Sequence, residues 1–132
     1  MESTIVGGPF IVVAEELDVA GLHWQPEIGD EITYRDNLDQ VSILIDPDGM
    51  SPKELRQTYL WLPTVEQLVL QLEARQAILF HAGLEMGQGL FSYKTVVQAQ
   101  TGTIESLGVS LRISVGSALR ELLARENRKV MH

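Results

Sequence analysis

Two helix-start signatures near the middle of the sequence constrain its fold more than any other feature. In residues 51–54, a serine can cap a helix, a proline stands at the first helical position, and Glu54 can bond back to the capping residue. Residues 64–67 repeat the capping pattern, and the apolar side chains that follow recur at helical spacing. Pro63 disfavours helix at the residue before it, which separates the two segments. The sequence therefore predicts two helices within about residues 51–76.

The part of the chain before these helices is typical of strands separated by turns. Residues 31–34 alternate polar and apolar side chains, as a strand with one buried face does, and residues 41–45 form another β-rich segment. Residues 10–13 are apolar and rich in β-branched side chains, so we predict a strand there too. Residues 21–25 are a further candidate for a short strand. The turns we expect between these segments are residues 26–30, 35–37 and 46–49.

A β-hairpin is predicted at about residues 78–98. Its first strand is residues 78–82, and its antiparallel mate is residues 91–97, in which every second side chain belongs to one face. A glycine-rich link, residues 83–89, joins the two strands. This link lacks the glycine spacing of a dinucleotide-binding loop, and the Gly-Lys-Ser/Thr of a P-loop is absent. We therefore interpret it as a flexible connection and not as a phosphate site.

The C-terminal segment fits two different periods. From Leu107 to Val115 the apolar side chains alternate, which favours a strand, yet several of the same side chains also lie on one helical stripe. Residues 118–126 are helical on either interpretation. We predict one helix over about residues 105–126, although its two glycines, Gly108 and Gly116, each disfavour a helix by about 1 kcal/mol relative to alanine.

Runs of strands and runs of helices, in place of strict alternation, indicate the α+β class. We predict a single globular domain over residues 1–132, with a mixed or antiparallel sheet packed against two to three helices. The order expected along the chain is an acidic β-rich part at 1–50, helices at about 51–76, a hairpin at about 78–98 and a C-terminal helix at about 105–126. The apolar content of 45% is that of an ordinary globular protein.

Charge is distributed unevenly along the chain, whose formal net charge is −8. Residues 1–50 carry 11 acidic side chains and one basic side chain, whereas residues 51–132 carry 7 and 9. Because phosphate binding needs a basic face, we do not expect nucleic acid as a partner. The chain has no cysteine, which excludes disulfides, thiolate catalysis and cysteine-ligated metal sites.

Targeting and membrane signals are not evident in the sequence. The N-terminus has no basic stretch ahead of an apolar run, and the apolar run at 10–14 is far shorter than the roughly 20 residues of a membrane span. The sequence therefore predicts a soluble, cytoplasmic protein without a membrane partner. It offers no cofactor-binding motif, so none is expected.

Four side chains are the best candidates for chemistry. Histidine side chains commonly serve as general acids and bases, and Glu85 is close in sequence to His81. This pair is therefore the candidate for acid–base catalysis, against the commoner role of a structural histidine. Asp46 and Asp48 are candidate ligands for a hard cation. The residues after them break the calcium-loop pattern, and a type I turn explains both aspartates without a metal.

Residues 59–62 place four large side chains in a row just before the second central helix. One interpretation is a buried plug, because such runs are usually internal. The other is an exposed anchor made by Tyr59, Trp61 and Leu62, because tryptophan and tyrosine are frequent at interaction hot spots.

The sequence carries no decisive functional motif. We expect a non-catalytic interaction or accessory protein that self-associates or binds a protein partner. The alternative is a small-ligand binder or an enzyme whose pocket lies near His81, Glu85, Asp46 and Asp48.

Overall fold

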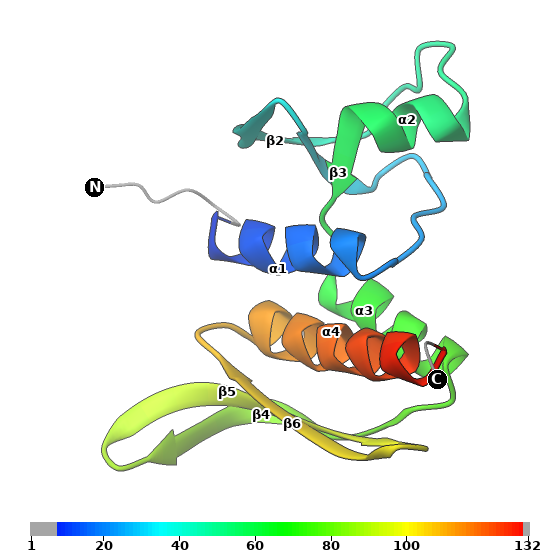
Figure 1. The fold of residues 1–132 in the computed structure, drawn as a ribbon. Coiled ribbons are helices and arrows are strands. Elements are labelled where there is room, and N and C mark those ends of the chain that lie inside the picture. The colour runs from blue at the N-terminus through cyan, green and yellow to red at the C-terminus, as the bar shows by residue number, and fades with distance from the viewer. Residues whose placement is uncertain (1–7, 131–132) are drawn as a thin grey trace. The chain divides into compact units, whose positions relative to one another are not determined.

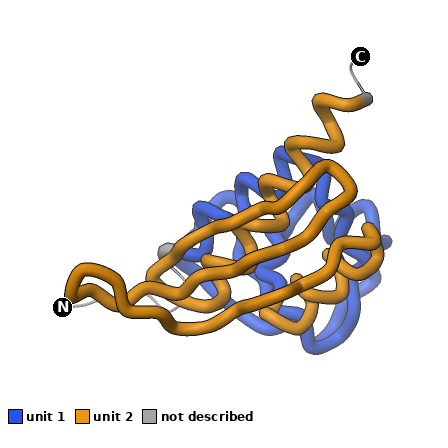
Figure 2. Tube along the Cα trace, turned by 90° about the horizontal axis from the view of Figure 1, so that it is seen from below, with its two compact units in different colours: residues 1–63 blue, residues 64–132 orange. Residues whose placement is uncertain are grey.

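A computed structural model of the protein describes residues 8–130, and the chain divides into two compact units, Met1–Pro63 and Thr64–His132 (Figure 2). Each unit contains a three-stranded sheet, and the described residues form four helices (Figure 1). All strand pairs are antiparallel. The predicted α+β class is confirmed, and the strands form two sheets where the sequence suggested one.

The described part of unit 1 starts with a helix, α1 (Gly8–Val19), so the strand predicted at residues 10–13 is wrong. Four apolar residues are too few to distinguish a helical period from a strand period. The whole segment shows the helical period, because its exposed side chains, Val12, Glu15 and Glu16, fall between buried ones. The buried side chains of α1 are Phe10, Ile11, Val13, Ala14 and Leu17.

The first sheet has the order β2-β1-β3. β1 (Glu31–Tyr34) has the predicted bounds, and β2 (Asn37–Ile43) begins earlier than predicted, directly after a turn. β3 (Tyr59–Trp61) follows the helix α2 (Pro52–Thr58) and pairs with the other side of β1. The short strand suggested at residues 21–25 is absent, since that segment has no regular structure from Leu22 onward.

Both predicted capping boxes are confirmed. Ser51 Oγ accepts a hydrogen bond from Glu54 N at 3.2 Å, and the Glu54 carboxylate accepts one from Ser51 N at 2.8 Å. The same backbone N–H lowers the pKa of the Glu54 carboxyl group. At the start of α3 (Val65–Ala74), Thr64 and Gln67 exchange the equivalent bonds. These reciprocal bonds satisfy N–H groups that a helix start leaves unpaired.

The second sheet, in unit 2, contains the predicted hairpin. β4 (Ile78–Gly87) pairs with β5 (Leu90–Ala99), and the chain turns at Gln88 and Gly89, both of which have positive φ. Most of the glycine-rich link is therefore strand and not loop. This extends the hairpin well beyond its predicted first strand.

A third strand, β6 (Gly102–Gly108), pairs with β5, so the helix predicted from about residue 105 is wrong at its start. α4 (Leu111–Val130) begins after Ser110, whose Oγ accepts a hydrogen bond from Ile113 N at 3.1 Å. The alternating pattern was the correct one up to Gly108. Pairing with β5 along the full length of β6 decided between the two periods.

α3 and α4 both cover one face of the second sheet, which we call the inner face (Figure 1). Its core includes a buried polar pair, in which the hydroxyls of Thr95 and Ser114 lie 2.7 Å apart. The fully buried apolar side chains described in this unit are Leu68, Leu72, Val97, Ile104, Val115, Ala118 and Leu119. The opposite, outer face is the one that carries polar and charged side chains.

Gly108 marks a close approach between β6 and α4. A Cβ atom at this position would lie 2.8 Å from both Ile113 Cγ2 and the backbone nitrogen of Ser114. We expect Gly108→Ala to lower the free energy of unfolding by about 1–3 kcal/mol, as overpacking does. Gly87→Ala is the matched control, because a Cβ there meets nothing within 4 Å. Equal stability of the two variants in chemical denaturation would contradict this arrangement.

Candidate interaction surface

The structure brings His81 and Glu85 together on the outer face of β4. Their Nε2 and Oε2 atoms lie 3.0 Å apart, and both side chains are about half exposed. Gly83 stands between them, and a Cβ there would lie 3.5 Å from the His81 ring. This is an ordinary van der Waals distance, so the ring packs closely over the Gly83 backbone.

A second ion pair lies beside the first. Lys94 is the cross-strand partner of Gly83, and its Nζ lies 3.4 Å from Glu105 Oε1 on β6. Such half-exposed pairs contribute little to stability because water and salt screen them. Among residues 8–130, no three histidine, aspartate or glutamate side chains gather closely enough to hold a metal ion. The outer face thus carries these two polar or charged pairs, and apolar Leu107, the cross-strand partner of Lys94, is also exposed there.

Asp46 and Asp48 lie in the exposed loop between β2 and α2 of unit 1. Asp48 N donates to Asp46 Oδ1 at 2.9 Å, and Met50 N donates to Pro47 O at 2.9 Å. The turn is present as predicted, but Asp48 and Gly49 both have positive φ, which is characteristic of type I′ and not of type I. A joint pocket with His81 and Glu85, which belong to unit 2, stays a prediction.

The run at residues 59–62 is largely built into unit 1. Leu62 is 0% exposed, whereas Tyr59 and Trp61 are partly buried. The Tyr59 ring meets Tyr34 edge-on with 5.0 Å between ring centroids, and Trp61 stacks on a second tryptophan. Partial burial raises the pKa of the Tyr59 phenol. The role of these three side chains as a partner anchor stays a prediction.

An apolar surface that the sequence reasoning missed lies at the end of the β4–β5 hairpin. β6 ends opposite Tyr93, so the hairpin continues beyond it as only two strands (Figure 1). Two cross-strand pairs lie at this end of the hairpin, Leu84 with Tyr93 and Met86 with Phe91, and all four side chains are on the inner face. Leu84, Met86 and Phe91 are 54%, 66% and 67% exposed. We call Leu84, Met86, Phe91 and Tyr93 the hairpin patch.

The hairpin patch adjoins an unpaired strand edge. Within the part of the chain that the structure describes, β4 pairs with β5 alone, so its other edge offers backbone N–H and C=O groups. Exposed edges are usually protected by lysine, proline, bulges or short length. β4 is ten residues long and contains neither lysine nor proline, and its one irregularity lies between Leu79 and His81. From there to Gly87 the edge is regular.

The chain was compared with protein-family models, with curated proteins and with solved structures, and none of them matches it. In residues 8–130, no helix is both long enough and apolar enough to cross a membrane.

Proposed function

We propose that this protein is a non-catalytic interaction protein that self-associates through the unpaired edge of β4 and the hairpin patch. One observation supports this most strongly: large apolar side chains in cross-strand pairs lie exposed beside a long strand edge that is unpaired among the described residues. Exposed apolar patches on soluble proteins mark interaction sites, and an open edge is a template for pairing with another strand.

A second copy of the chain is the partner that this edge fits. Two identical strands can always pair antiparallel about a two-fold axis, which gives a closed dimer. If that axis passes beside Gly83, His81 of one copy lies opposite Glu85 of the other, and a hydrogen bond between imidazole and carboxylate would favour this register. The inner faces of the two sheets then lie on the same side of the dimer, and Leu84 of both copies belongs to one continuous apolar surface.

Sedimentation velocity over a wide range of protein concentrations tests the proposal. We expect the sedimentation coefficient to rise with concentration from that of a monomer toward that of a dimer. A monomer at every concentration would contradict the proposed function.

The ligand-binding or enzymatic alternative is favoured by one observation, the 3.0 Å contact between His81 and Glu85. On our account this pair is a solvated surface pair. His81→Ala should therefore change the free energy of unfolding by no more than about 0.5 kcal/mol and leave any thermal stabilisation by small molecules intact. A compound that stabilises the wild type but not His81→Ala, in a thermal-shift comparison, would support the alternative instead.

A further inference from the structure

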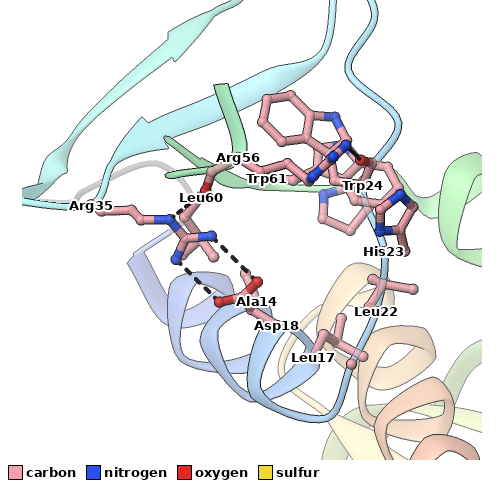
Figure 3. Close-up of a pocket in the computed structure, with 12 residues that line it drawn as sticks. Ala14, Leu17, Asp18, Leu22, His23, Trp24, Arg35, Arg56, Leu60 and Trp61 are labelled. Carbon is pink, nitrogen blue, oxygen red and sulfur yellow. Dashed lines mark hydrogen bonds and ion pairs between the residues drawn. The ribbon is translucent and has the colours of Figure 1, made fainter. Parts of the chain in front are cut away.

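Unit 1 contains a cavity of about 260 Å³ whose walls carry both cationic and aromatic side chains (Figure 3). It is lined by the C-terminal half of α1, the loop that follows it, and residues of α2 and β3. Both tryptophans of the chain, Trp24 and Trp61, line it, together with the guanidinium groups of Arg35 and Arg56. Leucines from α1, the following loop and β3 complete the apolar wall.

All three guanidinium nitrogens of Arg35 form hydrogen bonds within the cavity wall. Its two terminal nitrogens lie 3.1 and 3.3 Å from the oxygens of Asp18, and its Nε donates to the backbone oxygen of Arg56 at 2.8 Å. Figure 3 shows these bonds joining α1 to the opposite wall. Because Asp18 neutralises Arg35, this pair adds no net charge to the cavity.

Arg56 differs from Arg35 in having no carboxylate partner among the described residues. One of its terminal nitrogens donates to the Trp24 carbonyl oxygen at 3.0 Å, and Figure 3 shows its side chain extending toward Trp24. The side chain is only partly exposed. A guanidinium that is partly withdrawn from water is usually paired with an anion. The cavity therefore presents one positive charge that nothing in the described chain neutralises.

The two indole N–H groups are satisfied differently. Trp24 Nε1 donates to the buried Asp30 carboxylate at 2.9 Å, whereas Trp61 Nε1 is buried and has no acceptor among the described residues. The two rings stack, with 6.4 Å between their centroids and 15° between their planes. An unsatisfied buried donor is costly and uncommon in folded proteins. Trp61 Nε1 is thus a buried donor without an acceptor in the described chain, on a residue that lines the cavity.

We infer that this cavity binds a small organic carboxylate with an apolar body. The carboxylate would pair with the Arg56 guanidinium, whose planar fork matches two carboxylate oxygens, and the apolar body would lie against the tryptophans and leucines. The volume is slightly below the roughly 300–1,000 Å³ of common ligand pockets, which favours a ligand of one ring or a short chain. Such a carboxylate could be a free small molecule or the C-terminus of a peptide.

Intrinsic fluorescence reports directly on this site, because both tryptophans line it. Benzoate serves as the probe for a free small acid, and N-acetylphenylalanine serves as the probe for a peptide C-terminus. We expect saturable fluorescence changes with both, and whichever binds more tightly identifies the favoured source. Benzamide, which has the same ring without the charge, should bind about tenfold or more weakly.

Two substitutions in α2 test whether the charge of Arg56 binds the carboxylate. Arg56→Gln should weaken benzoate binding about tenfold or more, because it removes the unpaired cation. Lys53→Gln removes the same charge from an exposed position on the same helix and should change the affinity less than about twofold. If Arg56→Gln unfolds, Arg56→Lys keeps the charge and should still prefer benzoate to benzamide. Equal binding of benzoate and benzamide, unchanged affinity in Arg56→Gln, or no saturable response at all would overturn the inference.

Discussion

Leu84→Lys is expected to weaken self-association about tenfold or more. In an antiparallel pair of β4 strands, the two copies of residue 84 approach one another across the two-fold axis, so the substitution places two like charges in the apolar surface. It also introduces the side chain that natural sheet edges use to prevent pairing. Because Leu84 is already 54% exposed, the monomer should keep its stability to within about 0.5 kcal/mol.

Leu70→Lys is the control for this experiment. Leu70 is also a leucine of unit 2 with more than half of its surface exposed, but it lies on α3 and away from the strand edge. Sedimentation of both variants at matched concentrations separates a specific edge effect from a general effect of added charge. Equal weakening by the two substitutions would mean that the β4 edge is not the site of association.

Leu119→Ala is expected to lower the free energy of unfolding by about 2–5 kcal/mol. Leu119 is fully buried in α4, on the side that packs against α3 and the inner face of the sheet. Truncating it removes apolar surface from the core and leaves a cavity that the neighbouring side chains can fill only in part. Urea denaturation followed by circular dichroism measures the change.

Leu70→Ala makes the same chemical change at an exposed position and should alter stability by no more than about 0.5 kcal/mol. The difference between the two variants tests the register of α4 on the sheet. If Leu119→Ala were as mild as Leu70→Ala, the face of α4 that points into the core would have to be a different one.

Features governed by local chemistry could be predicted from the sequence. The starts of α2 and α3 were predicted correctly, because a capping box involves only four consecutive residues and its bonds are the same in any fold. The β4–β5 hairpin was also predicted, because a side-chain period of two on both sides of a glycine-rich segment specifies antiparallel pairing. Its length was underestimated, since Gly83 and Gly87 suggested a loop where the strand continues.

Segments that fit two periods could not be resolved from the sequence. Residues 10–13 are β-rich, yet they form part of α1, and residues 105–108 belong to β6 although Leu107 shares a helical stripe with α4. In both segments, the decisive factor is the surface against which the side chains pack. Ile104 pairs with Val97 of β5 and is buried in the unit on whose sheet α4 packs, which no local pattern reveals.

The candidate sites also differ in how far they could be predicted from the sequence. His81 and Glu85 were paired from their closeness in sequence, but they meet because β4 continues through a segment that was predicted to be a loop. The cavity around Arg56 was not, since its walls come from separate segments between Ala14 and Pro63. The hairpin patch was missed for another reason. Its apolar side chains are typical of a core, and only the structure shows that β6 ends opposite Tyr93 and that most of these side chains are more than half exposed.

Disulfide crosslinking of Gly83→Cys tests the central claim most directly, because the natural chain has no cysteine. Residues opposite one another in an antiparallel pair have Cα atoms about 4.5–5.5 Å apart, within the range that a disulfide spans. We predict that Gly83→Cys forms covalent dimers on mild oxidation, whereas Thr103→Cys, on β6 at the other edge of the sheet, does not. Absence of dimers from Gly83→Cys, or equal yields from both positions, would contradict self-association through β4.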